Sequence, residues 1–339
     1  MLRLLAMVTA MMAATAGSAA EARALVIGHR GASAVRPEHT LASYREAIRA
    51  GADFIEPDLV STKDHVLVAR HENDITGTTD VAEHPEFAAR KVTKIIDGTS
   101  ETGWFTEDFT LAELKTLHAR ERLPQLRPAN LAYTDERIPT FAEIIALAKA
   151  AGRPVGIYPE TKHPSYFRGI GLPLEPPLLA ALKAAGWTTA DAPVFIQSFE
   201  IGNLKALRSQ TGVRLIQLVD AGTSADGQSY DAMMTPAGLK AIAAYADGIG
   251  PNKDRIIPRD ANAKLLAPTS LVADAHAAGL KVHPWTFRPE NYFLPLDFRI
   301  GTDPRGHGDL AAEYRTFLAT GIDGLFSDDP GSAAVAVRK

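Results

Sequence analysis

Two histidines, an arginine and two carboxylates stand in three short segments, each close behind an apolar run: His29 and Arg30, Glu56 and Asp58, and His71. Side chains two positions apart on a strand point to the same face, so Glu56 and Asp58 would present hard oxygen ligands to one cation. Imidazole can accept and donate protons near neutral pH. At strand ends, this combination indicates metal-assisted cleavage of a phosphodiester.

Length and composition limit the classes of protein that need to be considered. The chain has 339 residues, of which 46% are apolar, enough for one α/β barrel of about 250 residues with an insertion. Its net charge of −4 offers no basic excess for nucleic acid or anionic lipid. The absence of cysteine excludes disulfides and thiolate catalysis, and a zinc site would have to use histidines and carboxylates alone.

The N-terminus has the pattern of a cleavable secretory signal. Arg3 precedes an apolar run from Leu4 to Ala14, and small residues follow at 16–20. The run is shorter than the roughly 20 apolar residues that span a bilayer, so cleavage is favoured over a membrane anchor. We expect residues 1–22 to be a signal peptide and the mature protein to be exported, in the periplasm, without stable membrane insertion.

Beyond residue 22, short β-rich runs alternate with helical stretches, as in a parallel sheet with crossover helices. The expected strands are Leu25–Gly28, Phe54–Leu59 with a continuation at Val66–Ala69, Val155–Tyr158, Val194–Gln197, Leu215–Val219, Gly248–Gly250, Val282–Trp285 and Gly324–Phe326. The expected helices are Leu41–Ala50, Phe141–Ala150, Leu178–Ala185, Ile201–Gln210, Pro236–Tyr245, Ser270–Ala278 and Leu310–Thr320. Eight strand positions favour an α/β fold of the closed (β/α)8 TIM-barrel type, although an open doubly wound sheet has the same alternation.

Two stretches break this alternation. Residues 74–138 are charged and rich in turn residues, with one expected helix at Leu111–Arg120. A structureless loop of that length is unusual in a compact domain, so we expect an inserted subdomain after the second strand. The second stretch, residues 287–309, follows the seventh strand, where barrel loops line the site. Residues 23–339 are thus expected to form a single barrel catalytic domain with 74–138 as an insertion.

Short motifs recur in order through most of the chain. They are His29–Ala32, Arg36–Leu41, Gly51–Leu59, Thr62–Asp64, His71–Asn73, Tyr158–Lys162, Ile196–Phe199, Pro284–Thr286 and Ser327–Pro330. Together they resemble the glycerophosphodiester phosphodiesterases, in particular the exported, periplasmic bacterial branch, and the insertion is similar too. Each fragment is weak by itself, but their order and spacing are specific.

The resemblance implies a role for each of the chemically active residues. Glu56, Asp58 and Glu160 match the family's divalent-metal ligands, and an all-carboxylate set favours Ca²⁺ or Mg²⁺ over zinc. His29 and His71 match the catalytic pair, one deprotonating the attacking oxygen and the other protonating the leaving alkoxide. Which histidine takes which role is open.

The remaining site residues concern substrate binding. Arg30 is expected to act in catalysis and, with Lys162, to bind the phosphate, since charge on the phosphoryl oxygens must be stabilised. Gln197, Phe199 and Trp285, together with Phe326, lie at or just past strand ends and would form the wall around the glycerol or the alcohol. For the aromatic residues, packing in the barrel core is an equally good explanation.

The other histidines carry no clear chemical signal. His65, His84, His118, His276 and His307 lie in no motif and are expected to be structural. The roles of His39, His163 and His283 stay open; for His39, capping the following helix is a sufficient role.

The predicted function is metal-dependent hydrolysis of glycerophosphodiesters to sn-glycerol 3-phosphate and an alcohol. The nucleophile is either the substrate's own 2-hydroxyl, through a cyclic phosphate, or water. Two other functions stay open: a lipid phosphodiesterase of the phospholipase D kind, and a non-catalytic exported binding protein for phosphorylated ligands. The expected partner is the small-molecule substrate and not nucleic acid, and a homodimer is an open alternative to a monomer.

Overall fold

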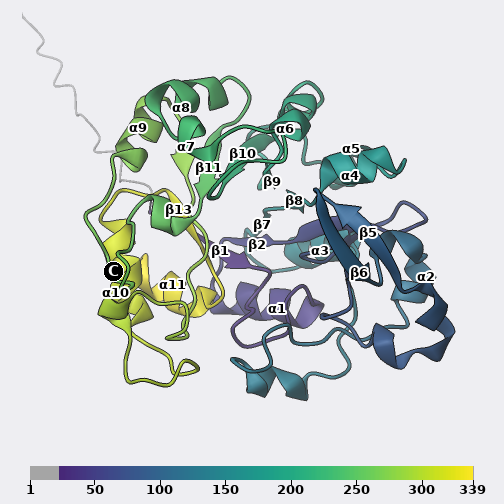
Figure 1. The fold of residues 1–339 in the computed structure, drawn as a ribbon. Coiled ribbons are helices and arrows are strands. Elements are labelled where there is room, and N and C mark those ends of the chain that lie inside the picture. Colours follow the sequence, from purple (N-terminus) through teal and green to yellow (C-terminus); the bar gives the residue numbers. More distant parts are fainter. Residues whose placement is uncertain (1–22, 339) are drawn as a thin grey trace, which may run out of the picture.

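The protein is described by a computed structural model, which covers residues 23–338, so the expected signal peptide lies outside the described residues. The eight positions of a barrel are filled in chain order (Figure 1). They are β1 (Leu25–His29), β2 (Phe54–Glu56) continued by β3 (Asp58–Ser61), β7 (Gly156–Ile157) continued by β8 (Glu160–Thr161), β9 (Phe195–Ser198), β10 (Arg214–Val219), β11 (Gly248–Pro251), β12 (Lys281–Val282) and β13 (Gly324–Ser327).

The sheet closes on itself. β1 pairs in parallel with both β2 and β13, and parallel pairing runs from β8 through β9, β10 and β11 to β12. Between β12 and β13 the backbone amide of Asp323 donates to the carbonyl of Val282 at 3.0 Å, and that of Phe326 donates to Pro284 at 3.0 Å. The (β/α)8 prediction is therefore confirmed, and the open doubly wound sheet is excluded.

Two prolines divide the second and third barrel strands. Pro57 separates β2 from β3, and Pro159 separates β7 from β8, because proline has no N–H to give to the ladder. Their carbonyls still accept: the amide of Glu160 donates to Pro57 and that of Gln197 donates to Pro159, both at 2.9 Å. The expected single strand Phe54–Leu59 is corrected to two short strands with the break between its two acidic residues.

The expected continuation at Val66–Ala69 also needs correction. β4 (Leu67–Ala69) runs antiparallel to β3, so it is a return strand at the barrel's rim and not part of the barrel ladder. This turn back brings the segment that follows β4, with His71, toward the barrel's mouth.

Helices cover the outside of the barrel, close to the expected positions. They are α1 (Leu41–Ala50), α3 (Phe141–Lys149), α5 (Glu175–Ala185), α6 (Ile201–Arg208), α8 (Pro236–Ile242), α9 (Leu271–Ala277) and α10 (Leu310–Leu318), with α4 (Pro164–Gly169), α7 (Tyr230–Met233) and α11 (Pro330–Ala336) in addition. The side chain of Thr40 caps α1, and Thr140 and Glu143 form a capping box on α3. Within residues 23–338, none of the helices is both long and apolar enough to cross a membrane.

Residues 74–138 contain short elements instead of one long helix. They are four 3-10 turns (Val81–Glu83, Pro85–Arg90, Thr106–Asp108, Pro128–Ala132), the hairpin β5 (Val92–Ile96) and β6 (Thr99–Gly103), and the one-turn helix α2 (Leu111–Leu114). The helix expected over Leu111–Arg120 therefore stops after its capped first turn. At the hairpin tip Asp97 and Gly98 both have positive φ, 47° and 83°, the backbone of a two-residue turn.

Aromatic packing fills the inside of the barrel. Ile27, Phe54, Tyr158, Phe195, Ile216 and Phe326 form one buried cluster there, and the larger core lies between the sheet and the helices. Gly156 makes room for the ring of Phe54: a Cβ at this position would overlap that ring and lie 2.7 Å from the carbonyl oxygen of Pro193. This dense layer is the floor beneath the barrel's mouth.

Gly156→Ala is expected to lower the free energy of unfolding by about 1–3 kcal/mol, because the added methyl overpacks the barrel core. Denaturant unfolding followed by circular dichroism measures this. Gly77→Ala is the matched control, since a Cβ there meets no atom within 4 Å. Equal stability of the two variants would contradict the packing we describe.

Candidate active site

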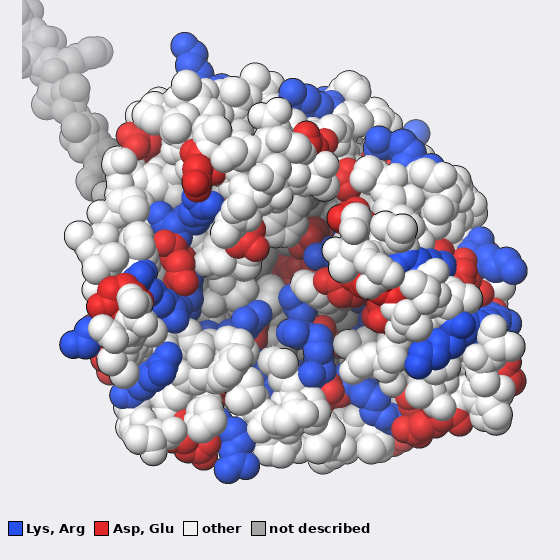
Figure 2. All heavy atoms as spheres, in the orientation of Figure 1, with Lys and Arg blue, Asp and Glu red and all other residues white. Residues whose placement is uncertain are grey.

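A cavity of about 370 Å³ opens at the carboxyl ends of the barrel strands. Figure 2 shows this face hollowed at its centre, with acidic and basic side chains along the walls. Ten residues singled out from the sequence line this cavity: His29, Arg30, Glu56, Asp58, His71, Glu160, Lys162, Gln197, Phe199 and Trp285. Phe326, named with the last three, lines it too. The five histidines expected to be structural do not line it.

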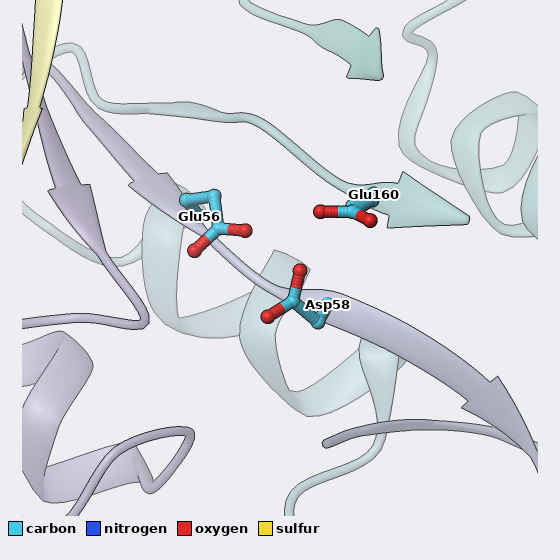
Figure 3. Close-up of side chains that lie close together, drawn as sticks. All are labelled: Glu56, Asp58 and Glu160. Atoms are coloured by element: carbon cyan, nitrogen blue, oxygen red, sulfur yellow. The ribbon is translucent and has the colours of Figure 1, made fainter. Parts of the chain in front are cut away.

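Three carboxylates converge within the cavity, one from the end of β2, one from the start of β3 and one from the start of β8 (Figure 3). Glu56, Asp58 and Glu160 each offer an oxygen, and these oxygens lie within 4.8 Å of one another. All three side chains are buried. Oxygen ligands with this spacing and charge suit a hard divalent cation such as Ca²⁺ or Mg²⁺.

The electrostatics of the triad agree with such a site. Burial and the charge of Asp58 raise the pKa of Glu56 well above its ordinary value. Burial also raises the pKa of Glu160, to about 8, although Lys162 opposes this. Gln197 donates from Nε2 to Oε1 of Glu56 at 3.2 Å, while its own buried Oε1 has no protein partner among the described residues. A divalent cation bound here would remove the cost of holding these acids together, so the residues fit the metal.

His39, whose role the sequence left open, holds one of the three acids. Its Nε2 lies 2.9 Å from Oδ2 of Asp58, and its Nδ1 lies 2.7 Å from the hydroxyl of Tyr44. Burial raises the pKa of Asp58, but the hydrogen bond from His39 and the positive charge nearby, including that of Lys162, outweigh burial, and the pKa falls well below the ordinary value. His39 is thus a support for Asp58, and the cap of α1 is Thr40.

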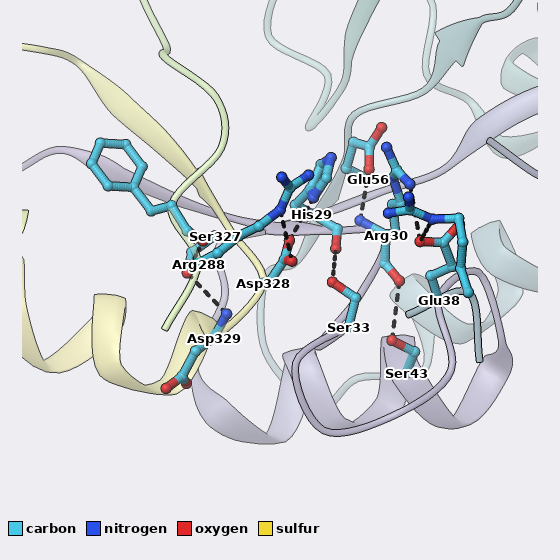
Figure 4. A network of polar contacts seen from close by, with 12 residues as sticks. His29, Arg30, Ser33, Glu38, Ser43, Glu56, Arg288, Ser327, Asp328 and Asp329 are labelled. Atoms are coloured by element: carbon cyan, nitrogen blue, oxygen red, sulfur yellow. Dashed lines mark hydrogen bonds and ion pairs between the residues drawn. The ribbon is translucent and has the colours of Figure 1, made fainter. Parts of the chain in front are cut away.

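His29 ends β1 and is held by an aspartate that follows β13. Its Nδ1 lies 2.6 Å from Oδ1 of Asp328, which in turn accepts from Arg288 at 3.2 Å (Figure 4). Asp328 also accepts from Arg127 at 2.6 Å. Because an ionised carboxylate only accepts, Nδ1 carries the hydrogen and Nε2 keeps its lone pair. Burial, then the charge of Arg30, lower the pKa of His29 to about 4, so the ring is neutral at pH 7.

His71, in the loop after β4, has a similar arrangement. Its Nδ1 lies 2.7 Å from Oε1 of Glu72. Burial and the charges of Arg30 and Lys162 lower the pKa of His71 to about 3, so this ring is also neutral at pH 7. The cavity therefore contains two neutral imidazoles, each with a carboxylate at Nδ1 and an Nε2 available for proton transfer.

Two cationic side chains line the cavity beside the acids. Arg30 donates from its backbone N–H to Glu56 at 2.7 Å and from Nη1 to Glu38 at 2.9 Å, and it has a positive φ of 57°. The Nζ of Lys162 lies 3.1 Å from Oε1 of Glu160. Neighbouring carboxylates keep both side chains charged, which suits them to bind the oxygens of a phosphate.

The two expected aromatic residues contact each other at the cavity wall. The rings of Phe199 and Trp285 meet edge to face with centroids 6.0 Å apart, and Nε1 of Trp285 donates to the carbonyl of Gly250 at 2.8 Å. Both are partly exposed, unlike Phe326, which belongs to the buried cluster. His283 also lies in the barrel interior, bonded at Nδ1 to the hydroxyl of Tyr158 at 2.8 Å.

Several residues that contact the chemically active side chains were given no role from the sequence. Asp328 lies in a motif quoted above, where it received no role, and its position just past a barrel strand was the available signal. Arg127 lies in the insertion, and Glu38 precedes α1; neither position follows from strand periodicity. Arg122 donates to Glu38 at 2.8 Å, so the insertion supports Arg30 as well.

Two imidazoles that each contact a carboxylate, beside three acids in the mouth of a (β/α)8 barrel, are the groups that a barrel hydrolase with acid–base chemistry needs. Comparison with known proteins narrows the class. A model of the glycerophosphoryl diester phosphodiesterase family matches residues 29–332. The chain belongs to this family.

Individual relatives align with this chain in sequence over most of their own length. Glycerophosphodiester phosphodiesterase GDPD6 of Arabidopsis thaliana is 40% identical over 328 residues, covering 90% of this chain and 84% of that protein. The glycerophosphodiester phosphodiesterase of Haemophilus influenzae is 30% identical, with coverage of 90% and 87%. A solved phosphodiesterase of Oleispira antarctica, in complex with the product sn-glycerol-3-phosphate, has 23% identity, a TM-score of 0.62 and coverage of 94% and 98%; it supports the fold.

Glu160→Gln is expected to weaken Ca²⁺ binding by about tenfold or more, because it removes one of three charged oxygen ligands. Isothermal titration calorimetry of the metal-free protein with CaCl₂ measures the affinity. Glu83→Gln, at an exposed glutamate of the insertion, is the control and should bind like the unmodified protein. Unchanged affinity in Glu160→Gln would place the cation elsewhere.

Proposed function

We propose that this protein hydrolyses glycerophosphodiesters to sn-glycerol 3-phosphate and an alcohol, in a reaction that requires one divalent cation, Ca²⁺ or Mg²⁺. The proposal rests on the observation that one cavity contains the three acids, two cationic side chains and two histidines that each contact a carboxylate. The names of the relatives and the product bound in the Oleispira antarctica enzyme support the substrate class.

Charged side chains bind the phosphodiester and the cation. Arg30 and Lys162 pair with the non-bridging oxygens of the phosphodiester, and Phe199 and Trp285 with Gln197 enclose the glycerol or the alcohol. Glu56, Asp58 and Glu160 hold the cation, which supplies positive charge at the phosphoryl oxygens when bound. Together these charges balance the anionic substrate, which the acids alone would repel.

Proton transfer falls to His29 and His71. The neutral rings are prepared to accept protons, and the anionic substrate beside them favours the charged imidazolium. One neutral ring takes the proton of the attacking oxygen, and the other, which takes up a proton from solvent as the anionic substrate binds, gives that proton to the leaving alkoxide. The attacking oxygen is the 2-hydroxyl of the glycerol or a water molecule; both routes need the same two tasks.

Further proposals concern the mature protein. We infer export to the periplasm after cleavage of residues 1–22, supported by the sequence pattern of that segment, and a single catalytic domain over residues 23–339 with 74–138 as an insertion. The order of the motifs favours the exported bacterial branch of the family. Association as a homodimer stays a prediction.

His29→Ala and His71→Ala are each expected to reduce turnover of glycerophosphocholine by at least about 100-fold, because each removes one proton-transfer group. Coupled detection of glycerol 3-phosphate measures the rate. Chelation of the cation should also abolish turnover, and added Ca²⁺ or Mg²⁺ should restore it. A non-catalytic binding protein would give no product at all, and a histidine whose removal leaves the rate unchanged would have no part in the reaction.

Asp328→Asn is expected to lower kcat by about 100-fold or more, because an amide no longer dictates which ring nitrogen of His29 carries the hydrogen. Steady-state kinetics checks this. Asp329→Asn, at the next residue, is the control, since that side chain contacts Ser332 and not His29. Equal kinetics in the two variants would remove Asp328 from the mechanism.

A further inference from the structure

A continuous set of close polar contacts between side chains leads from His71 to the tip of the inserted hairpin. Glu72 contacts two histidines: its Oε1 lies 2.7 Å from Nδ1 of His71, and its Oε2 lies 2.8 Å from Nε2 of His163. His163 in turn places Nδ1 2.6 Å from Oδ2 of Asp97. Three segments distant in sequence, namely the loop after β4, the start of α4 and the turn between β5 and β6, thus meet beside the cavity.

The carboxylates behind the two catalytic histidines differ in how they are held. Asp328, behind His29, is buried and receives hydrogen bonds from two arginines. The side chain of Glu72, behind His71, is 41% exposed, and in the described part of the chain its side-chain partners are the two histidines. An exposed glutamate has several rotamers of similar energy, so holding it costs entropy that a second partner must offset.

His163 is well placed to be that partner. It precedes Pro164 at the start of α4 and has a positive φ of 47°, which turns its side chain toward the loop after β4. Burial alone would lower the pKa of His163, but the hydrogen bonds to Asp97 and Glu72 raise it to about 9. The ring therefore carries hydrogens on both nitrogens at neutral pH and donates to a carboxylate on each side.

The hairpin that carries Asp97 is itself anchored. Lys94 on β5 pairs with Glu107 at 2.8 Å, and the hydroxyl of Tyr166 on α4 donates to the same carboxylate at 2.6 Å. Figure 1 shows the hairpin beside α4, in agreement with these contacts. Asp97 is consequently presented to His163 from a fixed position.

We propose that His163 and Asp97 are positioning residues of the reaction: they hold the carboxylate of Glu72, which orients the ring of His71 and keeps its hydrogen on Nδ1. The inference rests on the proposed function. It gives the insertion a part in catalysis, because a residue at the tip of its hairpin helps to set the position of a proton-transfer group. None of these residues needs to touch the substrate.

His163→Ala is expected to lower kcat for glycerophosphocholine by about tenfold or more with KM within about twofold, since proton transfer is sensitive to small displacements while the phosphate contacts stay in place. His84→Ala is the matched control: His84 also lies in contact with two acids, Asp80 and Glu86, but within the insertion and away from the cavity. It should leave kcat unchanged.

Conservative replacement and a double variant separate positioning from simple packing. Asp97→Asn keeps an oxygen that accepts from His163 and should retain kcat within about threefold, whereas Asp97→Ala should reproduce the loss seen in His163→Ala. The double variant Asp97→Ala/His163→Ala should be no slower than either single variant, because both remove the same restraint on Glu72. Independent structural roles would instead multiply the losses.

The outcomes distinguish the inference from the proposed function. No turnover by the unmodified protein with added cation would overturn the proposed function. An active protein in which His163→Ala keeps its kcat would overturn the inference alone. A fall in kcat of the same size in the control variant, or loss of the native unfolding transition in His163→Ala and Asp97→Ala alike, would also count against it. A selective drop in kcat with rescue by Asp97→Asn supports it.

Discussion

The mutual repulsion of three buried carboxylates is the constraint on which the rest of the site depends. Glu56, Asp58 and Glu160 bring oxygens within 4.8 Å of one another in a buried setting, where like charges interact strongly. The fold offsets part of this with hydrogen bonds to Glu56 and Asp58 and with the charges of Arg30 and Lys162. Holding three acids this close together costs free energy unless positive charge compensates it, and a bound divalent cation would supply that charge. Both histidines line the same cavity.

The position of the site in the barrel was predictable, but its supporting contacts were not. Alternation of side chains along a strand correctly put Glu56 and Asp58 on one face, and all ten expected residues reached the same cavity. The alternation of side chains in the sequence gives no sign that Pro57 and Pro159 interrupt their strands. The interruption at Pro57 places Glu56 at the end of one short strand and Asp58 at the start of the next. Supports such as Asp328 come from far along the chain, at a separation of 299 residues from His29, where no local pattern applies.

The structure of the insertion was also predictable from the sequence only in part. Residues 74–138 lack the periodicity of a helix or strand, which marked them as an insertion. The hairpin within them was not predicted, although Asp97-Gly98 between two β-rich runs is a strong turn signal. The expected helix Leu111–Arg120 had a good start, a capping box at Thr110, but a start signal carries no information about length. Tertiary contacts decide how far this helix continues beyond its first turn.

Contacts from the insertion reach residues that support three side chains of the cavity, namely His29, Arg30 and His71. Arg127 holds Asp328 behind His29, Arg122 holds Glu38 behind Arg30, and Asp97 reaches His71 through His163 and Glu72. The barrel strands supply the reactive side chains, and a barrel alone positions them only as well as its loops allow. Because one inserted segment contacts the supports of both imidazoles and of the arginine, a displacement of that segment would disturb all three at once, which argues that the insertion and the barrel mouth form a single structural unit around the cavity.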